Sequence, residues 1–240
     1  MPLTSVILAA GLVVTLGALV QGAVGYGMAL VAAPLLALFD PTLVPVPLIL
    51  LSSVHSVLAV VRDGRHADWP GIGWAILGRL PGTGLGVLAV VALSQQVFGL
   101  VVGLCVLACV VLSLLSWQPC PRPRALLLAG IASGAGGTAA GIGGPPIALL
   151  YQNEAGPRVR GTIAGYFILG SALSIAALAA ADQVTSESLA SAALLTPFLL
   201  AGFALSGPTR RVLDNGWTRR AVLAVAAASA VLLIGRAVLS

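Results

Sequence analysis

Two glycine-rich stretches contain the residues of this sequence whose types and spacing could do chemistry. They read QGAVGYG at positions 21–27 and SGAGGTAAGIGGPP at positions 133–146, and each lies near the middle of a long apolar segment. Glycine weakens a helix, and a helix that restarts after a break presents free N–H donors and a partial positive charge. We therefore expect both stretches to bind an anion at the start of a half-helix.

The candidate binding residues are the glycines that supply N–H groups and room, together with the polar and proline residues beside them. These candidates are Gln21, Gly22, Gly25, Tyr26, Gly27, Thr138, Gly141, Gly143, Gly144 and Pro145. We expect the half-helices to begin at about Tyr26 and Pro145, because proline suits a first helical turn. Two alternatives stay open. The glycines could serve close helix packing, and Gln21, Tyr26 and Thr138 could bond locally to the interrupted backbone.

The charged residues within the apolar segments favour an anion over a cation as the ligand. Arg79 and His55 are the deepest ionisable side chains, and no Asp or Glu lies at the middle of a segment. A cation site in a membrane usually contains a carboxylate. Arg79 could attract the anion, but we favour an extended side chain that reaches the lipid surface. Ser52, Ser53 and His55 could line the route to the site or simply pack.

Other chemistries fit these stretches poorly. The string VGYG at 24–27 matches a potassium-channel filter, but the corresponding AGIGG at 140–144 has no tyrosine. The run GIGGPP has neither the third glycine nor the βαβ context of a nucleotide-binding fingerprint. No nucleophile with a paired histidine is visible in the broken segments, and the three cysteines have no metal-ligand spacing. We expect no enzyme activity, metal or cofactor.

The composition places these stretches in a membrane protein. The chain has 240 residues, of which 59% are hydrophobic and only 8% charged, and its mean hydropathy is +1.07. A soluble domain has about 25% charged residues. All 12 basic residues are arginines, and their excess over 7 acids indicates loop orientation rather than a nucleic-acid partner. The expected partners are the lipid bilayer and a small anion.

The elements that must position the glycine stretches are apolar helices. Cutting the chain at charges and at Pro/Gly clusters gives eight segments, at 4–39, 42–61, 71–93, 97–117, 125–152, 161–181, 189–206 and 218–238. The first and fifth are too long for one span of about 20 residues, and these two contain the glycine stretches. We predict an all-α polytopic membrane protein with 8 to 10 membrane helices.

The two halves of the chain resemble each other. A shift of 116 positions brings Gly25 onto Gly141 without a gap, and the same shift superposes further glycines and prolines. The further pairs are Gly27 with Gly143, Pro41 with Pro157, Pro81 with Pro197 and Gly86 with Gly202. We predict two repeats, at 1–117 and 118–240, each with a broken-helix hairpin followed by three transmembrane helices.

Loop charges predict that the repeats are inverted. The loop at 62–70 is basic, whereas its partner at 178–186 holds only Asp182, and conversely 94–97 is uncharged while 210–213 has two arginines. Because basic loops stay in the cytoplasm, the halves must cross the membrane in opposite directions. Reading the broken segments as hairpins places ten arginines on the cytoplasmic side. They are Arg62, Arg65, Arg122, Arg124, Arg158, Arg160, Arg210, Arg211, Arg219 and Arg220. Asp40, Asp182, Glu187 and both termini then lie outside.

Three motifs resemble the TauE/SafE sulfite exporter family. They are GYGMALVAAP at 25–34, LPGTGLG at 80–86 and GIGGPP at 141–146. The resemblance runs over essentially the whole chain and implies a bacterial inner-membrane carrier of sulfite or small organosulfur anions such as sulfoacetate. The sequence departs from the usual pattern at Thr196-Pro197-Phe198, where the family commonly has a proline-glycine pair.

The sequence therefore predicts a secondary transporter of a small sulfur-containing anion, acting in export by alternating access around the two glycine-broken helices. A passive anion or small-molecule channel is the alternative within transport, and an intramembrane enzyme is the less favoured class. The identity of the sulfur anion, ion coupling and the oligomeric state stay open.

Overall fold

The chain is all-helical over the residues that the computed structural model describes, which are 3–114, 120–213 and 217–239. Its α-helices are α1 (Leu3–Val24), α2 (Met28–Phe39), α3 (Val46–Asp63), α4 (Trp69–Ala92), α5 (Gln95–Leu114), α6 (Pro123–Ala140), α7 (Gly144–Tyr151), α8 (Gly156–Ala180), α9 (Ser186–Leu213) and α10 (Trp217–Leu239). Short 3₁₀ turns cover Pro41–Leu43 and Gly64–His66. The predicted all-α class is confirmed, and the predicted boundary at 117/118 lies outside the described residues.

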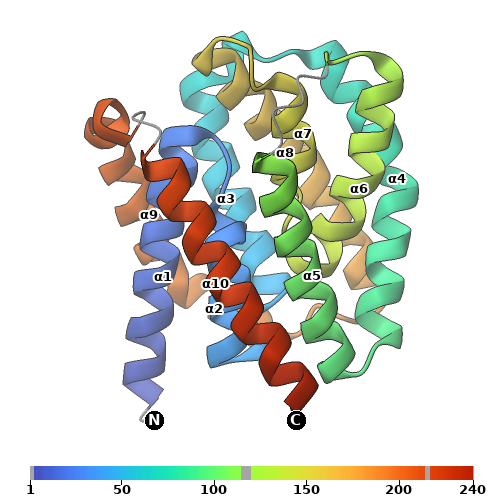
Figure 1. Cartoon of the computed structure of the whole chain (residues 1–240), viewed down its shortest axis with the longest axis vertical. Helices are drawn as coiled ribbons and strands as arrows, with labels where there is room; N and C mark the ends of the chain where they lie inside the picture. The colour runs from blue at the N-terminus through green and yellow to red at the C-terminus, as the bar shows by residue number, and fades with distance from the viewer. Residues whose placement is uncertain (1–2, 115–119, 214–216, 240) are drawn as a thin grey trace.

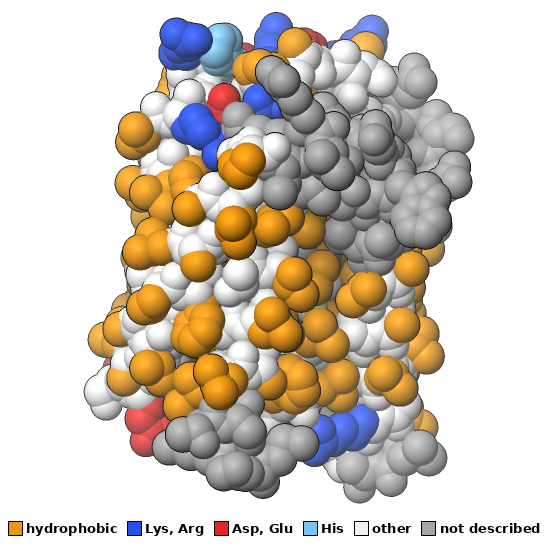
Figure 2. All heavy atoms as spheres, turned by 90° about the vertical axis from the view of Figure 1, so that its left-hand side faces the viewer, with side chains coloured by type: hydrophobic (Ala, Val, Ile, Leu, Met, Phe, Trp, Pro, Cys, Tyr) orange, Lys and Arg blue, Asp and Glu red, His pale blue; other side chains and the backbone are white. Residues whose placement is uncertain are grey.

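Five of these helices are long and apolar enough to cross a membrane. Their apolar parts are Ile7–Val24, Pro41–His66, Trp69–Ala92, Gly156–Ala180 and Ser186–Pro208 within the described chain. Helix α2 and parts of α5 and α10 are shorter apolar helices. Figure 2 shows hydrophobic side chains over the flank of the molecule, with charged side chains gathered at its two ends. This distribution is that of a multi-pass membrane protein.

Both long segments are interrupted at their glycines. Helix α1 ends at Val24 and α2 begins at Met28, and between them Gly25 and Gly27 have φ angles of 104° and 123°. Helix α6 ends at Ala140 and is capped by Gly141. Side chains disfavour such positive φ angles, so glycine is what permits the turns. The second halves begin at Met28 and Gly144, within two residues of the predicted starts.

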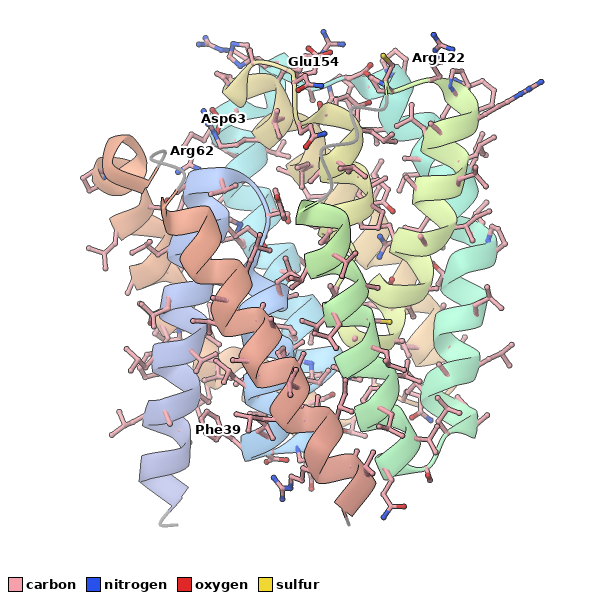
Figure 3. The ribbon with its side chains drawn as sticks, viewed as in Figure 1. Phe39, Arg62, Asp63, Arg122 and Glu154 are labelled. Atoms are coloured by element: carbon pink, nitrogen blue, oxygen red, sulfur yellow. The ribbon has the colours of Figure 1, made fainter. Side chains whose placement is uncertain are left out.

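The two interrupted segments form hairpins that start from opposite ends of the molecule. Helix α1 starts at the end near which α2 finishes, at Phe39 (Figures 1 and 3). Helix α6 starts at the other end, beside Arg122, and α7 returns toward Glu154 (Figure 3). Helix α10 ends at the same end where α1 begins (Figure 1).

Most arginines of the described chain gather at one end, which we call the arginine-rich end. Arg62, Arg122 and residues of the ion pairs lie there (Figure 3). The ion pairs join Arg62 and Arg160 to Asp63, and Arg158 to Asp68 and Glu154. At the opposite end, Arg236 donates to the carbonyl of Leu38 at 2.8 Å. Residues Arg210, Arg211, Arg219 and Arg220 lie in helices α9 and α10, and their side chains are not described.

Helix packing pairs each hairpin with a helix from the other half of the chain. The long arm α1 packs mainly against α9, and the long arm α6 packs mainly against α4. Helices α3 and α8 pack together, as do α5 and α10. The shift of 116 positions relates α1 to α6 and α4 to α9, so it exchanges the first two pairs and leaves the others unchanged.

Glycines bring α4 and α6 into backbone contact. A Cβ atom on Gly78 or Gly82 would overlap the carbonyl of Leu127 or Ile131, and one on Gly130 would overlap that of Ala75. We call this contact the glycine seam. Small residues allow such close approach in membranes, where dispersion contacts drive helix association.

The seam predicts a sharp difference between two glycines that lie two positions apart. Gly82→Ala should lower the thermal unfolding temperature in detergent, because overpacking costs about 1–3 kcal/mol. Gly84→Ala has nothing within 4 Å of its new methyl group, so its unfolding temperature should stay equal or rise. Equal unfolding temperatures for the two variants would contradict the seam.

Candidate functional site

The two helix interruptions meet inside the protein. A Cβ atom on Gly144 would lie 3.0 Å from the Cβ of Tyr26, which comes from the first interruption. A cavity of about 10 Å³ lies between them. Its lining contains the predicted residues Gln21, Gly27, Ser52, Gly141, Gly144 and Pro145, together with Ala29, Leu30, Ile142 and Phe167. Residues far apart in sequence are thus brought to one place.

An adjoining cavity contains Arg79. This cavity has a volume of about 20 Å³ and shares Ser52, Gly141 and Phe167 with the first. Gly137, Gly143, Ile49 and Ser171 complete its wall. One water molecule needs about 10–15 Å³ by this measure, so neither cavity has room for a polyatomic anion in this conformation.

Arg79 is buried and is held by hydroxyl groups. Only 3% of the residue is exposed. Its Nη1 donates to Tyr166 Oη at 3.0 Å and to Ser133 Oγ at 3.4 Å, and its Nη2 donates to Ser174 Oγ at 3.0 Å. The guanidinium carbon also lies 5.2 Å from the centre of the Tyr166 ring.

The charge of Arg79 has no ionic partner among the described residues, where the ion pairs involve other arginines. Its Nε is buried and has no hydrogen-bond partner in the same part of the chain. A buried cation usually pairs with a carboxylate, because hydroxyl dipoles replace only part of its lost hydration.

Glycines form the slot that holds the guanidinium. A Cβ atom on Gly170 of α8 would lie 2.7 Å from Arg79 Nε, and one on Gly137 of α6 would lie 2.8 Å from Nη2. The preferred interpretation that Arg79 reaches the lipid surface is therefore wrong. The glycine seam covers the neighbouring face of α4, and α8 closes over the side chain.

A chain of hydrogen bonds links Arg79 to the second interruption. Arg79 donates to Tyr166, Tyr166 Oη donates to Ser133 Oγ at 2.7 Å, and Ser133 donates to the carbonyl of Gly143. Thr138 Oγ1 and Ser174 Oγ lie 2.7 Å apart beside this chain. The guanidinium is thereby connected through hydrogen bonds to the residue that precedes α7.

The first interruption is stabilised by Gln21 and His55, both of which are buried. His55 Nε2 lies 3.2 Å from the carbonyl of Ala18, so Nε2 is the donor. Nδ1 then accepts from Gln21 Nε2 at 3.1 Å, while Gln21 Oε1 accepts from the N–H of Met28 at 3.3 Å. Gln21 thus satisfies a free N–H at the start of α2, as in the local-bonding alternative.

Other predicted residues lie outside the two cavities. The carbonyl of Gly22 accepts from Arg62 Nη2 at 2.6 Å, and a Cβ on Gly25 would lie 3.1 Å from Arg160 Cγ. Arg160 Nε donates to Asp63 Oδ2 at 3.1 Å. These groups cover the first interruption toward the arginine-rich end. Ser53 bonds to the carbonyl of Ile49 in its own helix at 2.8 Å.

Sequence reasoning missed the hydroxyl partners of Arg79 and the aromatic wall. Ser133, Tyr166 and Ser174 bond directly to the guanidinium, and Phe167 borders both cavities. The available signal was weak, because an isolated serine in an apolar helix usually bonds to its own backbone. In the described chain, no three His, Cys, Asp or Glu residues are placed to hold a metal.

Interrupted hairpins that meet close to a buried cation, within a multi-pass helical membrane protein, are typical of membrane transport proteins. The model of the sulfite exporter TauE/SafE family matches residues 8–233, and the chain belongs to this family. It is a family of membrane transporters, described as sulfite exporters. Comparison with curated proteins gave no match, and comparison with solved structures gave none.

The bonds of Gln21 predict that its first role is structural. Gln21→Leu leaves the N–H of Met28 and the Nδ1 of His55 without this partner, which should cost about 1–3 kcal/mol for each buried group. A double-mutant cycle with His55→Leu should show a coupling of at least about 0.5 kcal/mol. Unchanged stability with lost anion binding would instead make Gln21 a substrate ligand.

Proposed function

We propose that the protein is a secondary carrier that exports a small sulfur-containing anion, bound between the two interruptions beside Arg79. The observation that supports this proposal best is the buried charge of Arg79, which has hydroxyl partners and no carboxylate in the described chain. Removing an ion from water costs several kcal/mol even after relaxation. A negatively charged substrate offsets that cost, since the described part of the chain supplies no counter-charge to Arg79.

The chemistry of the site favours an oxyanion. A guanidinium presents planar N–H donors that match two oxygens of one sulfite or sulfonate group. The N-terminus of α7 begins at Gly144, and the neighbouring Gly143 belongs to the Arg79 cavity. Pro145 and Pro146 have no N–H, so this helix start adds partial positive charge together with the N–H of Gly144. Sulfite, sulfoacetate and related organosulfonates have such oxygens, and they agree with membership of the exporter family.

Transport requires the interruptions to separate, because the cavity of about 20 Å³ beside Arg79 is smaller than such an anion. Alternating access supplies this movement. The halves 1–117 and 118–240 act as inverted repeats, supported by hairpins that start from opposite ends and by packing pairs that exchange under the repeat shift. Opening on one side then mirrors opening on the other.

The proposed location is the bacterial inner membrane, with the arginine-rich end in the cytoplasm. Arg62, Arg122 and the ion-paired arginines lie at that end, and cationic segments are retained on the cytoplasmic side. Both chain termini are then extracytoplasmic.

Arg79→Gln tests the anion site by two effects of opposite sign. In purified protein without substrate, its unfolding temperature should be equal or higher, because an uncompensated buried charge is removed. Sulfite or sulfoacetate at 100 times its dissociation constant should stabilise the unchanged protein by about 2.7 kcal/mol, and Arg79→Gln should abolish this stabilisation. Arg79→Lys keeps the charge without the planar fork and should retain a weaker response.

The matched control is Arg236→Gln, which removes one arginine charge at the opposite end and should keep the full anion response. Stabilisation by acetate equal to that by sulfite, or an unchanged response in Arg79→Gln, would reject the proposed site.

Counterflow in proteoliposomes separates a carrier from the passive channel. Unlabelled sulfoacetate inside the vesicles should accelerate uptake of labelled sulfoacetate, because a loaded carrier returns with substrate. Uptake should also saturate with concentration. Linear flux without counterflow would favour the channel alternative.

A further inference from the structure

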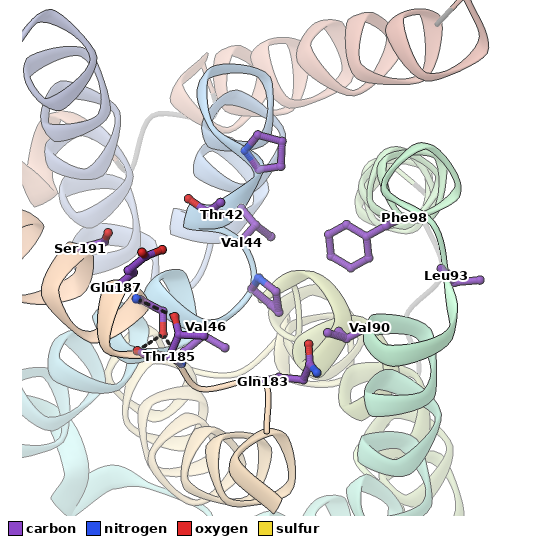
Figure 4. A pocket seen from close by; sticks show the side chains of 13 residues that line it. Thr42, Val44, Val46, Val90, Leu93, Phe98, Gln183, Thr185, Glu187 and Ser191 are labelled. Carbon is purple, nitrogen blue, oxygen red and sulfur yellow. Dashed lines mark hydrogen bonds between the residues drawn. The ribbon is translucent and has the colours of Figure 1, made fainter. Parts of the chain in front are cut away.

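A pocket of about 420 Å³ opens near the end of the molecule opposite the arginine-rich end. Figure 4 shows side chains from the α2–α3 connection, the end of α4, the start of α5 and the α8–α9 connection around it. Its polar members are Thr42, Gln183, Thr185, Glu187, Ser188 and Ser191. This pocket is large enough for a small hydrated anion, unlike the cavity beside Arg79.

An apolar cluster separates this pocket from Arg79. Its buried members are Val46, Ile49 and Leu178, which are 4%, 3% and 0% exposed. Val46 borders the large pocket, whereas Ile49, one helical turn further along α3, borders the Arg79 cavity. The same cluster therefore touches both spaces and fills the interval between them.

From the Arg79 cavity toward the pocket, three helices change from polar to apolar residues in the same order. On α4, Arg79 and Thr83 are followed by Val87 and then by Val90 at the pocket. On α8, Ser171 at the Arg79 cavity and Ser174 are followed by Ile175 and Leu178, and Gln183 beyond the helix end borders the pocket. On α3, Ser52 lies at the Arg79 cavity, followed toward the pocket by Ile49 and Val46.

A further polar atom marks the inner side of the cluster. The hydroxyl of Thr83 is buried without a hydrogen-bond partner in the described chain, one turn of α4 from Arg79 toward the pocket. A hydroxyl in such a position can take a passing oxyanion or water as its partner.

We infer that the pocket of about 420 Å³ is the outer mouth of the anion path, and that Val46, Ile49 and Leu178 form its gate. The inference rests on the proposed function, because it gives the anion at Arg79 its way out. Apolar constrictions block ions by excluding water, so the closed gate separates the Arg79 cavity from the pocket until α3 and α8 move apart.

The test measures whether the gate limits access from water to the Arg79 cavity. Cys105, Cys109 and Cys120 are replaced by alanine, and Ser171→Cys is introduced beside Arg79, with Gln183→Cys in the pocket as the exposed reference. Modification by an anionic methanethiosulfonate reagent is followed by mass spectrometry in purified protein. Gln183→Cys should react at least tenfold faster than Ser171→Cys.

Ile49→Thr should open the gate with little change of shape, because both side chains are β-branched. It should raise the reaction rate of Ser171→Cys by about tenfold and leave that of Gln183→Cys unchanged. Leu178→Ser is a second gate variant, which keeps the test possible if Ile49→Thr does not fold. Leu88→Ser is the matched control, since this leucine is 63% exposed and directly follows Val87 of the cluster.

Fast reaction of Ser171→Cys with the gate intact would overturn the inference, as would gate variants that react no faster than Leu88→Ser. The proposed function is tested separately, by the stabilisation that sulfite gives. Leu178→Ser, introduced without the added cysteines, keeps Arg79 and lies outside the lining of its cavity, so sulfite should still stabilise this variant. If sulfite stabilised none of the proteins while Ser171→Cys still reacted more slowly than Gln183→Cys, the proposed substrate would be rejected and the gate would stand.

Discussion

The positive charge of Arg79 is the constraint on which the rest of the site depends. Its guanidinium occupies a slot that exists because Gly137 and Gly170 have no side chains, and it is oriented by Tyr166 and Ser174. The slot requires α4, α6 and α8 to approach one another closely, and the glycine seam provides that approach between α4 and α6. The packing of α4 against α6 and the position of the buried charge therefore both depend on glycines.

The packing pairs also indicate which parts of the protein move together. The glycine seam joins α4 to α6, and α1 is joined to α9 by a hydrogen bond of 3.1 Å from Thr15 to the carbonyl of Phe198. The long arm of each hairpin is thus held by a helix from the other half. Movement that separates the interruptions at Tyr26 and Gly144 is expected between these two pairs, because interdigitated backbones do not slide easily.

Composition and spacing could predict the helices and their interruptions, because apolar length and glycine clusters are local signals. The starts of α2 and α7 fell within two residues of expectation for that reason. The burial of Arg79 could not be predicted, since it depends on what covers one face of α4. Ser133 and Ser174 were missed because nothing local distinguishes a serine that contacts a cation from one that bonds to its own helix. Ile49 and Leu178 likewise resemble lipid-facing residues in the sequence.

The hydroxyl-lined slot has an electrical consequence for the proposed exporter. With a monovalent anion bound, the charges of substrate and guanidinium cancel, and the membrane voltage exerts little force on the loaded site. After release, the positive charge of Arg79 keeps the hydroxyl groups of Ser133, Tyr166 and Ser174 as partners and has no carboxylate beside it in the described chain. A full crossing of one charge is worth about 2.3 kcal/mol per 100 mV. An inside-negative potential would then favour the return of the unloaded site toward the cytoplasm, so the voltage would reset the carrier rather than expel its cargo.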